Sequence, residues 1–134
     1  MRRPVLDATK QMGLNVLRVP ALLDGDSWRG VYFQAWNIAT NRPEVNIGEN
    51  GLQRLDHLIA DAEQAGIRLI LPLVNHWPDF GGMDRYVAWF HGSSRDSFYT
   101  DPAIRGAYQS YVSQILAREN TITGRAYKDE PAVL

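Results

Sequence analysis

The chain reads Gln11-Met12-Gly13-Leu14-Asn15-Val16-Leu17-Arg18-Val19-Pro20 near its start and Gln64-Ala65-Gly66-Ile67-Arg68-Leu69-Ile70-Leu71-Pro72 near its middle. The two segments are copies of one pattern: the end of a helix, a single glycine, and a run of branched apolar residues closed by a proline. Near-continuous apolar runs are typical of parallel strands that are covered on both faces. The repeat therefore predicts an α/β fold built from helix–strand units.

Three segments are predicted to be helices: residues 4–12, residues 50–65, and a segment from 101 to near 120. We expect Asn50 to cap the second helix and Gly66 to end it. Asp101 followed by proline is typical of the start of the third. Its predicted inward residues are Ile104, Ala107, Tyr108, Tyr111, Val112, Ile115 and Leu116. A last apolar run over residues 131–134 predicts a further strand, inside which the chain is expected to end.

The connections between these elements differ in length. Each helix-to-strand link is about one residue, whereas the strand-to-helix links cover residues 20–50 and 75–101, far beyond the usual 2 to 6 residues. Long loops that leave the carboxyl ends of parallel strands form the functional face of an α/β barrel or a doubly wound sheet. The long loops take up the residues that a compact doubly wound domain would need for its remaining strands, which argues against that fold. A complete (β/α)8 barrel takes about 250 residues, so we predict part of one barrel domain over residues 1–134.

Aromatic residues are concentrated in the two long loops. All four tryptophans and all four phenylalanines lie there: Trp28, Trp36, Trp77, Trp89, Phe33, Phe80, Phe90 and Phe98. Single aromatics in long loops often form small local hydrophobic clusters. For the set as a whole, we expect an aromatic-lined cleft.

Composition excludes several function classes. The 134 residues include 14 basic and 15 acidic side chains, dispersed along the chain, so no positive field favours nucleic acid or an anionic membrane. No apolar run approaches the roughly 18–20 residues that cross a bilayer. Cysteine is absent, and Gly81-Gly82 is followed by no Lys-Ser/Thr pair, so the sequence predicts neither a thiol nucleophile nor a phosphate loop. No cofactor is expected.

Polar residues at the strand ends are the candidate site residues. Arg18 lies in an apolar strand, where a guanidinium needs an acceptor, either as a structural salt bridge or to keep an active-site carboxylate ionised. Asn75-His76-Trp77 follows the second strand at the corresponding place. Two polar groups beside a large amphipathic ring suit a sugar, which presents hydroxyl groups and apolar C–H faces. The alternative for His76 is a loop histidine bonded to the backbone.

The other titratable residues give weaker signals. His57 and His91 lack partners at metal-ligand spacing, and no metal site is predicted. The loop carboxylates that could act as acid or base are Asp24, Asp26, Asp79 and Asp84. Such residues more often form turns or remain solvated.

Six blocks of the chain, taken together, resemble one family. They are residues 14–18, 51–56, 66–71, Val74-Asn75-His76-Trp77-Pro78-Asp79-Phe80-Gly81-Gly82, residues 98–102 and residues 121–131. In order and spacing they resemble the endo-β-1,4-mannanases of glycoside hydrolase family 5, especially their fungal and plant type. The likeness covers nearly the whole chain, and the block from Val74 to Gly82 is among its most specific parts.

The resemblance implies a (β/α)8 barrel that hydrolyses internal β-1,4 bonds of mannan with retention of configuration, using two glutamates roughly 5 to 5.5 Å apart. In the family, the acid/base glutamate follows an asparagine at the end of the fourth strand, and the nucleophile glutamate lies on the seventh strand. We therefore expect no catalytic residue in this chain, which would run from the first helix to the beginning of the fourth strand. Arg18 corresponds to the family's strand-two arginine that supports the nucleophile, while Asn75, His76 and Trp77 correspond to lining of the sugar cleft.

Two departures from the family leave alternatives open. Most relatives have a second asparagine where this chain has His76, and Val19-Pro20 replaces a more usual Thr-Trp. The second departure bears on the preference for mannan over another β-glycan. The alternatives are a barrel glycosidase acting on another β-glycan and a truncated, non-catalytic β-glycan-binding member. The resemblance also implies a secreted parent protein, and the isolated chain is expected to be inactive.

Overall fold

A short parallel sheet forms one end of the molecule. The computed structural model describes residues 2–25 and 29–134. Strand β1 (Val16–Arg18) pairs in parallel with β4 (Arg68–Ile70), and residue 133 forms a further parallel bridge to Leu69. The order of these segments in the sheet follows their order in the chain, and the helix–glycine–strand repeat is confirmed.

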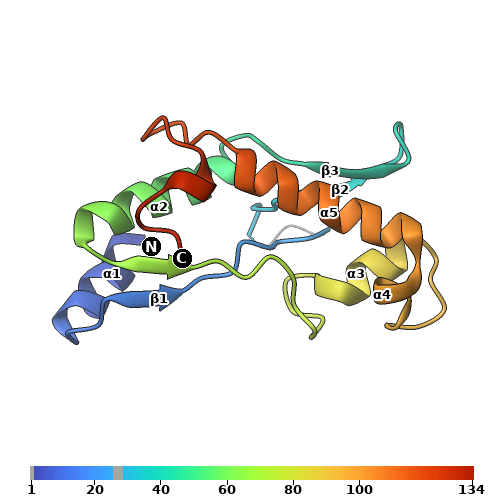
Figure 1. Ribbon diagram of the computed structural model, residues 1–134, viewed down its shortest axis with the longest axis horizontal. Helices are drawn as coiled ribbons and strands as arrows, with labels where there is room; N and C mark the ends of the chain where they lie inside the picture. The colour runs from blue at the N-terminus through green and yellow to red at the C-terminus, as the bar shows by residue number, and fades with distance from the viewer. Residues whose placement is uncertain (1, 26–28) are drawn as a thin grey trace.

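Helices cover one side of this sheet (Figure 1). Helix α1 (Arg2–Gln11) packs against α2 (Leu52–Ala65), and the long α5 (Pro102–Ala117) extends from this end of the molecule to the other. Gly13 and Gly66 adopt left-handed φ angles of 73° and 69°, which turn each helix into its strand. The main core lies between helices and sheet and includes Leu6, Leu52, Leu55, Ile59, Ile67, Leu69, Tyr111 and Ile115.

The opposite side of the sheet is uncovered. Leu17 is half-buried and Leu69 is fully buried, whereas Val16, Arg18 and Ile70 are exposed. The prediction that both apolar runs are covered on both faces is therefore wrong for this chain. Alternate strand residues point to opposite faces, and the described residues cover only the face toward the helices.

Helix ends confirm one predicted cap and correct another. The Asp101 carboxylate accepts hydrogen bonds from the backbone N–H groups of Ala103 and Ile104, as expected at the start of α5. Asn50 does not cap α2; the residue before the helix is Gly51, without a side-chain cap. The preceding turn is instead held by the side chain of Asn46, which accepts from the N–H of Gly48.

The two long loops contain secondary structure that the sequence pattern did not reveal. The first holds an antiparallel hairpin of β2 (Gln34–Asn37) and β3 (Arg42–Val45). The second holds α3 (Gly82–Trp89) and the single turn α4 (Ser97–Thr100). A short 3-10 helix, η1 (Tyr127–Asp129), precedes the residue-133 bridge.

Most loop aromatics form a second core rather than a cleft. Tyr86 is fully buried and makes edge contacts with Trp89 and Phe98, while Trp36 from the hairpin packs edge-on against Phe90. Phe33 belongs to the main core. The prediction of an aromatic-lined cleft is therefore wrong for these residues, because loops of this length bury their own apolar surface. Trp77 and Phe80 stay exposed, and Trp28 lies outside the described residues.

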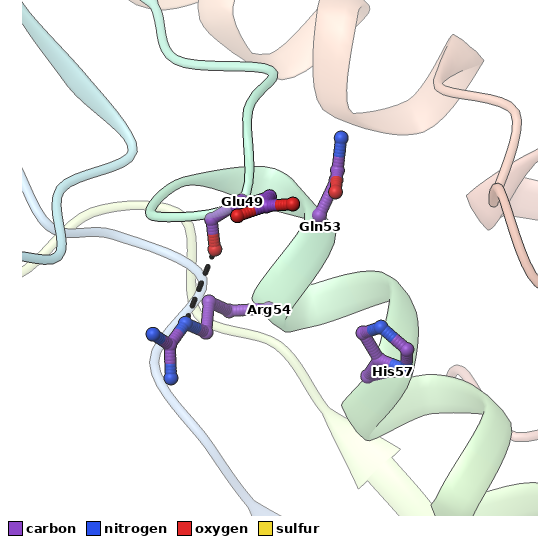
Figure 2. Close-up of a pocket in the computed structure, with 4 residues that line it drawn as sticks. All are labelled: Glu49, Gln53, Arg54 and His57. Carbon is purple, nitrogen blue, oxygen red and sulfur yellow. Dashed lines mark hydrogen bonds between the residues drawn. The ribbon is translucent and has the colours of Figure 1, made fainter.

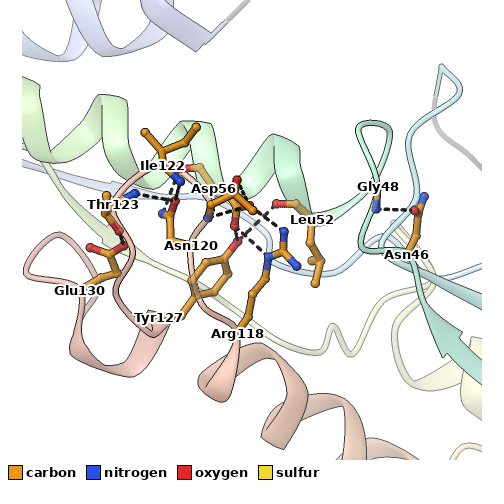
Figure 3. A network of polar contacts seen from close by, with 11 residues as sticks. Asn46, Gly48, Leu52, Asp56, Arg118, Asn120, Ile122, Thr123, Tyr127 and Glu130 are labelled. Carbon is orange, nitrogen blue, oxygen red and sulfur yellow. Dashed lines mark hydrogen bonds and ion pairs between the residues drawn. The ribbon is translucent and has the colours of Figure 1, made fainter.

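A buried polar network ties α2 to the connection that leads from α5 back into the sheet (Figure 3). The Asp56 carboxylate accepts two hydrogen bonds from Arg118, at 2.8 and 2.6 Å, and others from the hydroxyl groups of Thr121 and Tyr127. Asn120 donates to the Asp56 backbone carbonyl at 3.1 Å. Residues of the family-like block 121–131 thus have a structural role here.

Leu116 on α5 is exposed, contrary to its predicted inward position. Ile104, Tyr111 and Ile115 are buried as predicted. Among the helices of the described residues, none combines the length and apolar character that crossing a membrane requires.

Candidate functional site

The connection that follows β4 contains the predicted sugar-binding residues. Asn75 organises this turn: its Oδ1 accepts from the backbone N–H of Trp77 at 3.4 Å, and its Nδ2 donates to the carbonyl of Asp79 at 3.2 Å. Its backbone carbonyl also accepts from Met83 at the start of α3. Asn75 therefore shapes the turn that presents His76 and Trp77.

Three consecutive left-handed residues close this turn. Phe80, Gly81 and Gly82 have φ angles of 63°, 102° and 57°. A Cβ on Gly81 would lie 2.5 Å from the Cβ and carbonyl oxygen of Asp24, and one on Gly82 would lie 2.3 Å from the carbonyl oxygen of Asn75. Gly81 therefore lets the two long loops meet closely, and Gly82 lets the second loop fold back on its own backbone.

Asp24 is the centre of that meeting point. Its N–H donates to the Phe80 carbonyl at 2.8 Å, and its Oδ1 accepts from Gln34 Nε2 at 2.7 Å. The same Gln34 nitrogen lies 2.7 Å from the hydroxyl of Tyr86 on α3. Asp24 was predicted as a possible acid or base, but it is only 2% exposed, so it holds loops together instead.

The Asp24 carboxyl is poorly compensated. Its Oδ2 is buried and has no hydrogen-bond partner within the described part of the chain. Burial raises the pKa of Asp24 to about 7, although the hydrogen bond from Gln34, the backbone N–H of Gly82 and the charge of Arg85 act in the opposite direction. Burial is also the main cause that raises the pKa of Tyr86.

Trp77 and His76 form the exposed part of the turn. The indole of Trp77 is 64% exposed, and its ring centroid lies 5.4 Å from that of His76, nearly perpendicular to it. His76 Nε2 lies 3.0 Å from Nη1 of Arg95, which also pairs with Asp84. The expectation that His76 bonds to backbone is not met, since its polar partner is a side chain.

Arg18 is not brought to this turn. Arg18 pairs with Ile70 in the sheet, and Ile70 precedes Asn75 by five residues along the chain. The side chain of Arg18 is exposed on the uncovered face, and it has no hydrogen-bond or ion-pair partner among residues 2–25 and 29–134. The acceptor expected for Arg18 is therefore not supplied by the described residues.

The remaining candidates do not assemble a reactive centre. Asp84 is bound by Arg95, whose hydrogen bonds are the main cause that lowers the pKa of Asp84. Asp79 is exposed, and Asp26 lies outside the described residues. Within the described ranges no three His, Cys, Asp or Glu side chains gather as metal ligands, and His57 and His91 stand apart.

Figure 2 shows a pocket at the start of α2, none of whose lining residues is a predicted site residue. It has a volume of about 270 Å³ and is lined by Glu49, Gln53, Arg54 and His57. Arg54 donates to the Glu49 carbonyl at 3.1 Å, and both side chains are exposed. With polar, solvated walls and no buried functional group, this pocket offers no chemistry.

Sequence patterns did not identify Gln34, Tyr86 or Arg95. Gln34 reaches Asp24 across 10 residues, Tyr86 reaches Gln34 across 52 residues, and Arg95 reaches His76 across 19 residues. No local spacing rule marks such contacts. The only available signal was the arginine itself, placed in a long loop with few other basic residues.

The fold and the position of this turn define the class. Helix–strand units in a parallel sheet, with long connections at the carboxyl ends of the strands, are the architecture of part of a (β/α)8 barrel. Residues 2–120 match the cellulase family, glycosyl hydrolase family 5. The chain belongs to this family, as the sequence resemblance predicted.

Its similar proteins are mannanases. The chain is 41% identical over 132 residues to a mannan endo-1,4-beta-mannosidase F of Aspergillus clavatus, covering 96% of this chain and 28% of that protein. It is 39% identical to a mannan endo-1,4-beta-mannosidase A of Podospora anserina, with 96% and 32% coverage. The crystal structure of an endo-1,4-beta-mannanase from Rhizomucor miehei superposes with a TM-score of 0.94 at 38% identity, over 98% of this chain and 37% of that one. The chain thus spans about a third or less of the relatives' length.

Proposed function

We propose that this chain is part of a retaining endo-β-1,4-mannanase, in which Asn75, His76 and Trp77 line the sugar cleft and Arg18 supports the nucleophile. The names of the relatives and the family membership support the reaction class. The proposed substrate is β-mannan, and the parent protein is proposed to be secreted.

The exposed indole of Trp77 is the observation that carries this proposal. At 64% exposure it is an unusually open tryptophan beside a polar histidine. An aromatic face binds the apolar C–H face of a sugar, while neighbouring polar groups meet its hydroxyls. The other described tryptophans, Trp36 and Trp89, are half-buried in the second core.

Binding tests this proposal in the chain itself. We expect isothermal titration calorimetry to show saturable binding of mannohexaose by the 134-residue chain, and Trp77→Ala to abolish it while leaving the folded state intact. Ile38→Ala is the control, because Ile38 is 88% exposed at the tip of the β2–β3 hairpin. Equal affinity of Trp77→Ala and the unmodified chain would contradict the role of Trp77.

Hydrolysis tests the reaction class. The catalytic glutamates implied by the resemblance correspond to no residue of this chain, so the purified 134 residues are expected to release no reducing ends from mannan. The protein encoded by the whole genomic reading frame should hydrolyse mannan if that frame encodes an Asn-Glu-Pro segment beyond Leu134. Hydrolysis by the 134 residues alone would overturn this assignment.

Substrate preference has a second candidate. Val19-Pro20 stands where relatives usually have Thr-Trp beside the arginine, which favours testing other β-glycans. Mannan, glucomannan and cellulose compared side by side on the extended protein separate the two, since a mannanase should be fastest on mannan. A stop codon directly after Leu134 would instead support a non-catalytic β-glycan-binding protein.

A further inference from the structure

The guanidinium of Arg95 connects an acidic residue to the exposed histidine of the candidate site. Its Nε and Nη2 donate to the two carboxylate oxygens of Asp84, both at 2.8 Å. Its Nη1 lies 3.0 Å from Nε2 of His76. A bidentate pair of this kind fixes the plane of the guanidinium, so the direction of the third contact is fixed as well.

The chemistry of that contact determines the proton on His76. A guanidinium carries only donors and keeps its proton. Because Arg95 donates, Nε2 of His76 must accept, and the ring is neutral with its hydrogen on Nδ1. His76 then has one N–H that is not used by Arg95.

The position of the ring places this N–H where it can meet a sugar bound on Trp77. His76 is exposed and stands nearly perpendicular to Trp77, with an interplanar angle of 84°. A sugar stacked on the indole face turns its hydroxyl groups toward its edges, where a perpendicular neighbour meets them. A single donor of fixed direction can discriminate between hydroxyl configurations.

We propose that Arg95, anchored by Asp84, is a positioning residue that holds His76 as the neutral Nδ1–H tautomer, and that this N–H donates to a hydroxyl of the sugar on Trp77. The sugar contact rests on the proposed function, whereas the tautomer does not. A purely structural role, in which the three side chains only fasten the turn to α3, predicts no effect on the sugar beyond stability.

Nitrogen NMR of the imidazole rings tests the tautomer directly. The chain has three histidines, so a long-range 1H–15N spectrum of the labelled protein shows three rings, with His76 assigned by loss of its signals in His76→Gln. At neutral pH we expect His76 to be predominantly protonated at Nδ1. His57 and His91, both exposed, serve as internal references. A His76 spectrum with mixed tautomers like theirs would overturn the proposal.

Two variants separate positioning from stability. Arg95→Gln should release His76 to the mixed tautomer and weaken mannohexaose binding about three- to tenfold, the net worth of one hydrogen bond, with Tm measured alongside. Arg95→Lys, which can donate but cannot form the fork, should retain part of both effects. His76→Gln should weaken mannohexaose binding by a similar factor, a readout that does not depend on Arg95 variants folding well.

The outcomes distinguish this proposal from the proposed function. A fixed tautomer with no mannohexaose binding by the unmodified chain would overturn the sugar contact and the binding role of Trp77 together. Binding by the unmodified chain that Arg95→Gln leaves unchanged would overturn the positioning role and leave the proposed function standing. A mixed tautomer with weakened binding in Arg95→Gln, together with weakened binding in His76→Gln, supports it.

Discussion

Two buried aspartates, Asp56 and Asp24, show how differently this chain treats its two kinds of connection. Asp56 fastens α2 to the segment that leads from α5 back into the sheet (Figure 3), and Asp24 fastens the two loops that leave the strands. Both side chains are almost fully buried. The pKa of Asp56 is nevertheless lowered, whereas the pKa of Asp24 is raised.

The number of donors explains the opposite shifts. Burial opposes ionisation of Asp56, but hydrogen bonds from Arg118, Tyr127 and Thr121 outweigh it, and the pKa of Asp56 is lowered. Asp24 has one side-chain donor, Gln34, and an oxygen without a hydrogen bond among the described residues. Burial therefore dominates and the pKa of Asp24 rises to about 7.

The difference follows the division of labour in α/β barrels. Connections that lead into strands serve stability, and connections that leave them carry function. Both oxygens of the Asp56 carboxylate have hydrogen-bond donors, as a stabilising network requires. The Asp24 side retains an unsatisfied group beneath the candidate site, and such local inconsistencies are typical of functional regions.

Removing the Asp56 carboxylate should have the largest effect. Asp56→Ala leaves Arg118, which is 11% exposed, without its partner, so we expect a loss of about 3–5 kcal/mol in the free energy of unfolding. Urea denaturation at neutral pH measures this. Glu44→Ala is the matched control, because its partners Asn37 and Thr40 lie on an exposed hairpin, and it should leave the urea midpoint nearly unchanged.

Replacing Asp24 by asparagine should change the pH dependence of stability. Unfolded Asp24 ionises near its ordinary pKa of 3.8 and the folded group near 7, so folding stability is lost as the pH rises between these values. Three units correspond to about 4 kcal/mol. Asp24→Asn keeps the acceptor for Gln34 and should match the unmodified chain at pH 4 but exceed it above pH 7. Parallel stability curves from pH 4 to 8 would show that Asp24 does not titrate in this range.

A methyl group on Gly81 should separate the two loops at their closest contact. The added Cβ would lie 2.5 Å from Asp24 at a φ of 102°, so Gly81→Ala should destabilise by about 2–3 kcal/mol in thermal unfolding. Gly106→Ala on α5 provides the control. No atom lies within 4 Å of a Cβ there, and helix propensity predicts a gain of about 1 kcal/mol. Similar losses in both variants would argue against a close approach at Gly81.

The repeated units were predictable because they depend on local patterns. Gly13, Gly66 and the Asp101 cap each act within one turn of the backbone, and the apolar runs are nearly continuous. The parallel sheet followed from these patterns, whereas the family was identified from the resemblance of six blocks of the sequence. The wrong cap at Asn50 shows the limit, since the helix start was set by Asn46, which folds back through its own turn.

Tertiary contacts within the long loops were not predictable. The strands of the β2–β3 hairpin are four residues each and include Pro43, so they show no alternating pattern. Trp36 and Phe90 gave no sign of whether they would line a cleft or pack together across the loops. Of the candidate site, Asn75, His76 and Trp77 were located from the sequence. Their partner Arg95 and the supporting Asp24–Gln34 contact emerged only in three dimensions.

The uncovered face of the parallel sheet also governs how copies of this chain behave at high concentration. Each of its register pairs combines an apolar residue with an arginine, Val16 with Arg68 and Ile70 with Arg18. The arginines act as gatekeepers, since like charges oppose the stacking of two such faces and the growth of intermolecular strands. Exchanging both arginines for valine would leave a continuous apolar strip, a surface typical of aggregation.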